Sequence, residues 1–140
     1  MPELAEIVAQ HTGHSRTVLE YAATTGRLVT EAKAPGFDEA GWAPLAALVD
    51  TENFLRVGAF KEEMDWAGYV AFLTGWATTS EWEGTFRRIT EHGDLVFLEL
   101  EERSVVGDFR SVVNSLSVYE FSDDGRIRRL DLYLQMELPS

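Results

Sequence analysis

The sequence contains no cysteine, and it has 12 basic residues against 24 acidic ones. The first absence excludes disulfides, thiolate nucleophiles and cysteine metal ligands, and it leaves the redox compartment undetermined. The shortage of basic residues gives a formal net charge of -12. A surface of that sign repels phosphate backbones and anionic lipid headgroups, so we expect neither a nucleic acid nor a membrane as partner.

Long apolar runs are missing as well, since no stretch approaches the roughly 20 residues that cross a bilayer. The N-terminal stretch MPELAEIVAQHTGH has acidic residues where a secretion signal requires a basic start and an apolar run. The expected location is therefore cytoplasmic. His11, His14 and His92 form no H-x-x-x-H pair or histidine–carboxylate motif, and Gly-rich phosphate loops are absent. We expect neither a metal nor a cofactor.

What is present is the composition of a globular domain. The chain has 140 residues, of which 45% are hydrophobic and 11% aromatic. This length fits one domain over residues 1–140.

Helical patterns precede strand patterns along the chain. Helices are predicted to begin near Pro2, Ser15, Asp38 and Asp65, with a break at Thr12-Gly13. Alternating or β-rich segments predict strands, which we place at residues 53–60, 82–91, 95–106, 112–121 and 127–136. Helices separated from a run of antiparallel strands indicate an α+β fold. A curved sheet with helices on one face encloses a wedge-shaped interior that often contains a pocket.

The segment LVFLELEERS contains an apolar row that ends in a carboxylate. Side chains alternate across a strand, so Val96, Leu98, Leu100 and Glu102 share one face. If that face points inward, Glu102 lies at the rim of a cavity, where poor solvation suits a carboxylate to acid–base chemistry. The cavity's other walls would come from Ser115, Ser117, Tyr119, Leu130, Leu132 and Leu134. Alternatively, the strand twist carries Glu102 into solvent, or Arg103 or Arg110 pairs with it.

The order of the elements resembles the nuclear transport factor two-like superfamily, which includes ketosteroid isomerase, limonene epoxide hydrolase and the SnoaL-like polyketide cyclases. The most specific segment is SLSVYEFSDDGRIRRLDLYLQ (residues 115–135), and VLEY (18–21) and ALVDTENFLRV (47–57) are also similar. The resemblance implies a cone-shaped, cystatin-like fold with three N-terminal helices packed on a curved, mixed, mostly antiparallel sheet. The chain departs from the family in a long connection from Gly26 to Asp38, which either covers the pocket or merely extends the loop.

The resemblance also places possible site residues. Compared with ketosteroid isomerase, Tyr21 matches the tyrosine of the oxyanion hole, Ser117 takes the place of its aspartate, and the catalytic base falls on Val57 or a neighbour such as Arg56. A valine cannot move a proton, so that mechanism is not expected here. Compared with limonene epoxide hydrolase, Leu100 and Leu132 replace two of three charged groups, and Glu102 alone remains.

Two functional hypotheses follow. In the first, the protein is an enzyme for isomerisation, cyclisation, dehydration or epoxide opening of a small apolar molecule, with Glu102 as acid/base and Tyr21 as hydrogen-bond donor. In the second, the same cavity binds a ligand without catalysis, or the chain is a dimeric scaffold. The residues expected to contact the ligand in either case are Ser117, Tyr119, Leu98, Leu100, Val57, Trp66, Leu130 and Leu132.

The four tryptophans are expected mainly in the core, although Trp66 and Trp76, together with Phe72, could also form aromatic walls for a flat ligand.

The other face of the same strand predicts a partner subunit. Leu95, Phe97, Glu99 and Glu101 point away from the helices, together with Leu116 and Val118 of the next strand. A half-apolar sheet face without a covering helix favours a homodimer.

Overall fold

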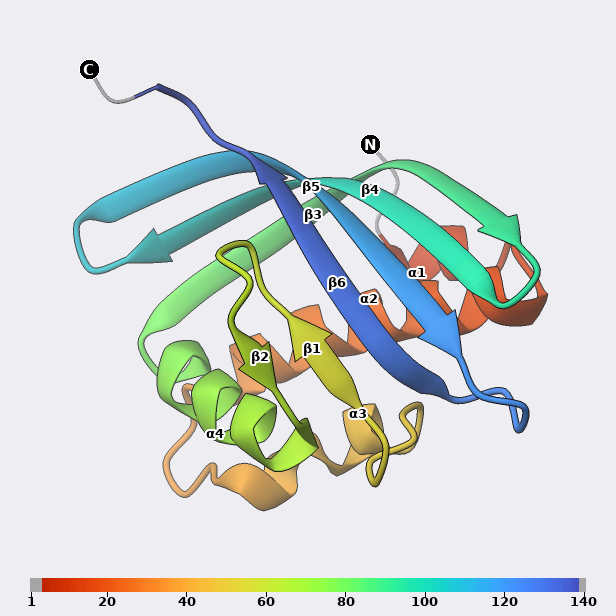
Figure 1. Cartoon of the computed structure of the whole chain (residues 1–140). Coiled ribbons are helices and arrows are strands. Elements are labelled where there is room, and N and C mark those ends of the chain that lie inside the picture. Colours follow the sequence, from red (N-terminus) through yellow and green to blue (C-terminus); the bar gives the residue numbers. More distant parts are fainter. Residues whose placement is uncertain (1–3, 139–140) are drawn as a thin grey trace.

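The computed structural model describes residues 4–138 and shows helices packed on a six-stranded sheet (Figure 1). The helices are α1 (Leu4–Val8), α2 (Gly13–Glu31), η1 (Glu39–Trp42, a 3-10 helix), α3 (Ala43–Ala46) and α4 (Trp66–Ala77). The strands are β1 (Leu55–Val57), β2 (Glu63–Met64), β3 (Ser80–His92), β4 (Leu95–Val106), β5 (Phe109–Phe121) and β6 (Ile127–Gln135). The predicted α+β class is confirmed.

The sheet is mixed and has the strand order β2-β1-β6-β5-β4-β3. Strands β3 to β6 form an antiparallel meander, whereas β1 runs parallel to β6 and antiparallel to β2. Figure 1 shows the twisted sheet arching over α2, with α4 and the η1–α3 segment below it. The interior therefore lies between the inner sheet face and the helices.

Helix α2 starts at Gly13, as the Thr12-Gly13 break predicts, but Ser15 does not cap it as expected. Ser15 lies in the first turn, where its backbone N and its Oγ donate to Glu91 Oε1 of β3 at 2.8 and 2.7 Å. A carboxylate from the sheet therefore satisfies a backbone amide in the first turn of the helix. The prediction at Asp65 is confirmed, because its side chain accepts from Gly68 N at the start of α4.

The expected connection from Gly26 to Asp38 is wrong in its first half. Helix α2 continues to Glu31 because Leu28 and Val29 extend its buried face, and the connection to η1 is confined to residues 32–38. The strand expected at residues 53–60 is reduced to β1, which a turn joins to β2. That short second strand was not predicted, since two residues are too few to show a pattern.

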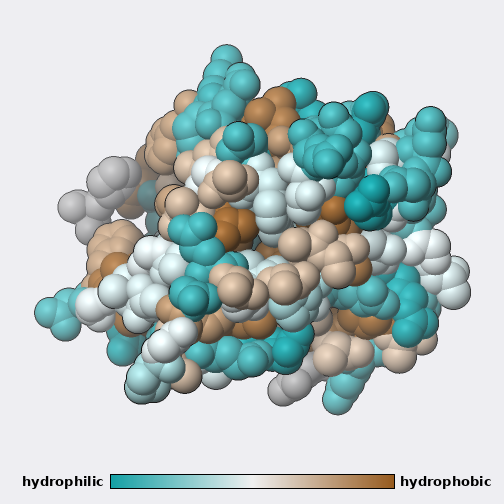
Figure 2. Space-filling model, turned by 90° about the horizontal axis from the view of Figure 1, so that it is seen from below, coloured by the Kyte–Doolittle hydropathy of each residue, from teal (hydrophilic) through white to brown (hydrophobic). Residues whose placement is uncertain are grey.

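The core is built from the inner sheet face and the apolar faces of α2, η1, α3 and α4. Val96, Leu98 and Leu100 are buried, as the alternation in β4 predicts. Viewed from below, the surface is hydrophilic around the edge and shows hydrophobic residues in separate patches (Figure 2). Within residues 4–138, no helix combines the length and apolarity that crossing a membrane requires.

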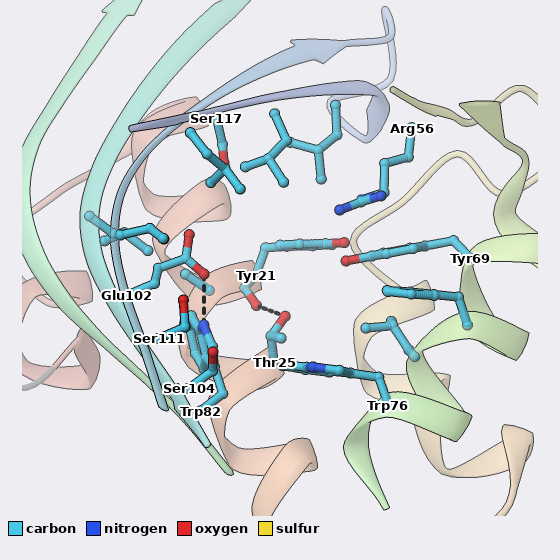
Figure 3. Close-up of a pocket in the computed structure, with 18 of the residues that line it drawn as sticks. Tyr21, Thr25, Arg56, Tyr69, Trp76, Trp82, Glu102, Ser104, Ser111 and Ser117 are labelled. Atoms are coloured by element: carbon cyan, nitrogen blue, oxygen red, sulfur yellow. Dashed lines mark hydrogen bonds between the residues drawn. The ribbon is translucent and has the colours of Figure 1, made fainter. Parts of the chain in front are cut away.

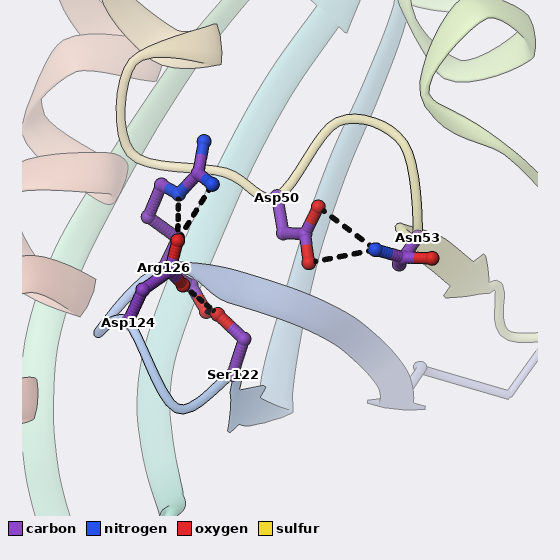
Figure 4. Close-up of polar contacts among 5 residues, drawn as sticks. All are labelled: Asp50, Asn53, Ser122, Asp124 and Arg126. Atoms are coloured by element: carbon purple, nitrogen blue, oxygen red, sulfur yellow. Dashed lines mark hydrogen bonds and ion pairs between the residues drawn. The ribbon is translucent and has the colours of Figure 1, made fainter.

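Polar contacts fix the chain just before β1 beside the turn that leads into β6 (Figure 4). Arg126 pairs with Asp124, and Asn53 Nδ2 donates to both carboxylate oxygens of Asp50 at 3.0 and 3.2 Å. Backbone bonds then link the two segments, from Asp50 N to Ile127 O and from Ile127 N to Leu48 O. These contacts set the parallel register of β1 on β6, and thereby the position of Arg56.

Candidate functional site

A cavity of about 340 Å³ lies between the inner sheet face and helices α2 and α4 (Figure 3). Its lining combines aliphatic, aromatic and polar side chains with one arginine and one glutamate. The lining residues are Tyr21, Ala22, Thr25, Arg56, Tyr69, Phe72, Leu73, Trp76, Trp82, Leu100, Glu102, Ser104, Ser111, Val113, Ser117, Tyr119, Leu130, Leu132, Leu134 and Met136.

Local periodicity explains how each element presents these side chains. On α2, Tyr21 and Thr25 are one turn apart on the cavity face. On α4, the cavity residues Tyr69 and Trp76 are two turns apart, with Phe72 and Leu73 between them. On β4, alternate residues from Leu100 to Ser104 face the cavity, so Glu102 is placed there by the strand repeat.

Glu102 lies in the wall formed by β3 and β4. Its Oε1 accepts a hydrogen bond of 2.7 Å from Trp82 Nε1 on β3. Arg103 instead pairs with Glu83 and Glu101, so the suggested ion pair between Arg103 and Glu102 is wrong. The indole N–H orients one carboxylate oxygen, and Glu102 as a whole remains part of the cavity wall (Figure 3).

The opposite wall carries a positive charge from Arg56 of β1. Its Nη1 is buried and has no hydrogen-bond partner within residues 4–138. The guanidinium carbon lies 4.9 Å from the centre of the Tyr69 ring and 5.8 Å from that of Phe72. Val57, which the family comparison had placed here, does not line the cavity, because successive residues of a strand point to opposite faces.

Three tyrosines supply neutral hydroxyls beside Arg56. Burial is the main cause that raises the pKa of Tyr21, Tyr69 and Tyr119 above the usual phenol value. These groups are therefore protonated at neutral pH and can donate hydrogen bonds. Tyr21 Oη is buried and makes no hydrogen bond of regular geometry among the described residues. It interacts with the Tyr69 hydroxyl, and Figure 3 shows it pointing toward that group and Arg56.

Most of the side chains proposed from the sequence line this one cavity. Those that do are Tyr21, Leu100, Glu102, Ser117, Tyr119, Leu130 and Leu132. Leu98 is buried in the core instead, and Trp66 packs edge-on against Phe54 with the ring centres 5.3 Å apart. Neither Leu98 nor Trp66 belongs to the lining, whereas Trp76 does.

Sequence reasoning missed several site residues. The family comparison indicated Arg56 only as a neighbour of Val57, and Tyr69 was not predicted at the site. The helical spacing of Tyr69 with Phe72 and Trp76 was a usable signal. No local signal identified Trp82 as the donor to Glu102, because that contact depends on the pairing of β3 with β4.

The described residues contain no group of three or more histidine, aspartate or glutamate side chains that could hold a metal ion. Two of the histidines have structural contacts. His11 Nδ1 lies 3.0 Å from Ile7 O, and the His14 ring stacks on Phe121 with centres 4.1 Å apart.

Comparison with known proteins identifies the fold. No protein-family model matches the sequence, and no curated protein matches it. Among solved structures, a protein classed with the SnoaL-like polyketide cyclases from Shewanella putrefaciens has a TM-score of 0.70 at 8% identity, covering 96% of this chain and 88% of its own. An LEH-like epoxide hydrolase from Mycobacterium tuberculosis has a TM-score of 0.59 at 18% identity, covering 80% of this chain and 84% of its own.

An NTF2-like protein of unknown function from Cytophaga hutchinsonii has a TM-score of 0.60 at 15% identity, covering 89% of this chain and 92% of its own. The chain therefore has the nuclear transport factor two-like fold that the sequence predicts. At these identities the likeness extends to the fold, and the chemistry must be argued from the site.

Proposed function

We propose that the chain binds a small, largely apolar molecule in this cavity and moves a proton on it. Glu102 is the acid/base, and Tyr21 donates a hydrogen bond to the reacting oxygen. The observation that carries the proposal is the placement of Glu102 across the same cavity from a cluster of hydrogen-bond donors, Tyr21, Tyr69 and Arg56 (Figure 3).

This arrangement suits proton removal next to a carbonyl group. The carboxylate of Glu102 takes a proton from the α-carbon, and the C–H electrons form a double bond between the α-carbon and the carbonyl carbon. The carbonyl π electrons move onto the oxygen, which gives an enolate. A neutral tyrosine hydroxyl at that oxygen stabilises the developing charge. Return of the proton to a different carbon completes an isomerisation, while attack of the enolate carbon on a second carbonyl of the same molecule gives cyclisation.

Trp82 contributes by fixing the base. Its indole N–H holds one oxygen of Glu102 at 2.7 Å, which restricts rotation of the carboxylate. The other oxygen is then the one available to a bound molecule. Apolar and aromatic walls lower the polarity around it, which strengthens electrostatic interactions inside the cavity.

The fold neighbours support small-molecule chemistry of this general kind, because they include an LEH-like epoxide hydrolase and a protein classed with the polyketide cyclases. Two charged residues of limonene epoxide hydrolase are nevertheless replaced here by Leu100 and Leu132, and the catalytic base of ketosteroid isomerase is replaced by Arg56 or Val57. The proposed roles therefore rest on this chain's own side chains.

Binding without catalysis is the second candidate function. The observation that favours it is the charge on β1, where the cavity wall carries Arg56 in place of a carboxylate. Among the described lining residues, Glu102 is then the one carboxylate available. A cavity of this kind could retain a ligand without reaction.

Hydrogen–deuterium exchange distinguishes the two functions. We expect the wild-type protein to accelerate exchange of the α-protons of 1-indanone in D2O, followed by NMR. Glu102→Gln should lower the protein-catalysed rate by about 100-fold or more, as for loss of a general base. Glu101→Gln is the matched control, because the neighbouring side chain lies on the opposite sheet face.

If the protein only binds, 1-indanone should bind saturably to wild type and to Glu102→Gln, while exchange stays at the buffer rate in both. Exchange that is accelerated equally by wild type and Glu102→Gln would contradict the assigned role of Glu102.

We also propose that a second copy of the chain covers the outer sheet face. The helices described pack on the opposite face (Figure 1). The outer face exposes 58% of Tyr133, and half-buried Phe97, Leu116 and Val118 lie beside it. A hollow of about 320 Å³ that includes Arg87, Tyr133 and Gln135 offers a recess for a partner side chain.

A further inference from the structure

We propose that the ligand is an anion: a flat, largely apolar carboxylate whose two oxygens bind the guanidinium of Arg56. This inference rests on the ligand-binding part of the proposed function and names the chemical class of the ligand. Proton transfer by Glu102 is not required for it.

Arg56 lines the cavity and forms no ion pair within residues 4–138. Among the other arginines, Arg87 and Arg110 form none there either, but both are exposed and lie outside the cavity lining. Those that form ion pairs within residues 4–138 are Arg16, Arg27, Arg88, Arg103, Arg126, Arg128 and Arg129. The chain has 24 acidic residues against 12 basic ones, so carboxylates are abundant. An arginine left unpaired in the cavity wall of such a chain indicates that its partner comes from outside.

The surroundings of Arg56 leave its charge only partly compensated. A guanidinium is permanently charged, and burying one of its N–H groups without an acceptor is unfavourable. Stacking on Tyr69, and more distantly on Phe72, offsets part of this cost. The Tyr69 hydroxyl also interacts with the guanidinium, yet Nη1 makes no hydrogen bond of regular geometry within residues 4–138. A ligand carboxylate supplies the missing acceptors, and the planar fork of arginine matches its two oxygens.

Neighbouring groups add donors at this end of the cavity. The Tyr21 hydroxyl is also buried without a hydrogen bond of regular geometry within residues 4–138, and it points toward the same region beside the Tyr69 hydroxyl (Figure 3). Clustered donors of this kind favour a negatively charged group over a neutral or cationic one. With the carboxylate on Arg56, Tyr21 remains free for a second, reacting oxygen of the same molecule.

Two carboxylates could compete with the ligand for Arg56. Glu62 on the β1–β2 turn interacts electrostatically with it, but Glu62 Oε1 is already bonded to Phe60 N at 2.9 Å. Glu102 lies on the opposite wall and is held by Trp82. Neither forms an ion pair with Arg56 in the part of the chain that the structure describes. The charge on Glu102 instead orients the ligand, because it repels a carboxylate toward the Arg56 end.

The shape of the rest of the cavity indicates a flat apolar body. Phe72, Trp76 and Trp82 contribute ring surfaces to the wall, and Leu100, Leu130 and Leu132 cover the sheet side. Aromatic carboxylates combine such a body with a single anionic group.

Calorimetric titration of matched ligand pairs tests the inference. The pairs are benzoate with benzamide, trans-cinnamate with cinnamamide, and 1-naphthoate with 1-naphthamide. For the pair that fits the cavity best, we expect wild type to bind the carboxylate at least tenfold more tightly than the amide. Arg56→Met should remove this preference, and Arg56→Lys should retain part of it. Arg27→Met, which removes an exposed arginine outside the cavity lining, should leave it unchanged.

A second variant separates the inference from the proposed catalysis. Glu102→Gln removes a negative charge from the opposite wall, so it should tighten carboxylate binding several-fold and leave amide binding within twofold. Carboxylate binding through Arg56 without 1-indanone exchange would support the anion site and count against proton transfer by Glu102. Exchange of the 1-indanone protons that depends on Glu102, without a preference for carboxylates, would support the proposed catalysis and refute the anion site.

Three results overturn the inference: no carboxylate of the set binds wild type, carboxylate and amide bind equally, or the preference persists in Arg56→Met. The first two use wild-type protein alone, so the test stands even if Arg56→Met does not fold.

Discussion

Replacing Glu91 by glutamine should loosen the start of α2, the helix that presents Tyr21 to the cavity. Glu91 Oε1 accepts from both Ser15 N and Ser15 Oγ, at 2.8 and 2.7 Å. Glutamine keeps an oxygen of similar reach but loses the charge. The interaction with the positive end of the helix dipole is therefore lost, while both hydrogen bonds can persist in neutral form.

The size of the effect follows from the exposure of the site. A charge at a helix N-terminus contributes about 0.3–1 kcal/mol. Because Glu91 is largely exposed, solvent screens its charge, and we expect Glu91→Gln to lower the free energy of unfolding by about 0.5 kcal/mol. Glu91→Ala also removes the acceptor, and losses of helix-capping acceptors are about 1 kcal/mol, within a range of 0.5–2. For a chain of this length, that corresponds to a fall in Tm of about 3–4 °C.

The effect should depend on pH in a defined direction. The hydrogen bond from the Ser15 hydroxyl is the main cause that lowers the pKa of Glu91 below its ordinary value of 4.5. A depressed folded-state pKa contributes stability that is complete above the ordinary value and is lost as pH falls through the lowered one. The difference between wild type and Glu91→Gln should therefore be constant near pH 7 and shrink below pH 4.5.

Urea unfolding of both proteins, monitored by circular dichroism between pH 7 and pH 3.5, measures this difference. Glu137→Gln, which removes an exposed carboxylate outside the helices and strands, controls for the change in net charge. A stability gap that grows on acidification, or one that Glu137→Gln reproduces, would refute the reasoning.

Two further predictions concern the base and the outer sheet face. Trp82→Phe removes the indole donor to Glu102, and a hydrogen bond to a charged group contributes about 1.5–3 kcal/mol. The 1-indanone exchange rate should therefore fall by about tenfold or more, while the 1-indanone affinity measured by calorimetry changes less than threefold. An unchanged exchange rate would refute the orienting role of Trp82. Tyr133→Glu places a charge on the proposed dimer face, so sedimentation velocity should show a dimer for wild type and a monomer for the variant. A wild-type protein that is monomeric at all concentrations would exclude the dimer.

The parts of the fold that the sequence predicted correctly are those with a local repeat. The alternation of Val96, Leu98, Leu100 and Glu102 predicted both the strand and its inward face, and the strands predicted at residues 112–121 and 127–136 form the closing hairpin. Asp65 marked the start of α4 because its carboxylate caps that helix directly. In each case the signal and the structure depend on residues close in sequence.

The errors arose where distant contacts decide the outcome. Gly26 was taken as the start of a connection, yet it lies inside α2, where an added Cβ would come within 3.2 Å of the Trp82 ring. Glycine there makes room for the indole that binds Glu102, which no local pattern reveals. The same holds for the choice between Arg56 and Val57, since a shift of one residue exchanges the two faces of a strand.

A crystal structure of the protein with 1-indanone tests the central claim most directly. The account predicts the ketone inside the cavity, with its oxygen within about 3.2 Å of Tyr21 Oη and its α-carbon facing the carboxylate of Glu102. A ketone bound outside the cavity, or bound inside it with the α-carbon turned away from Glu102, would contradict the account.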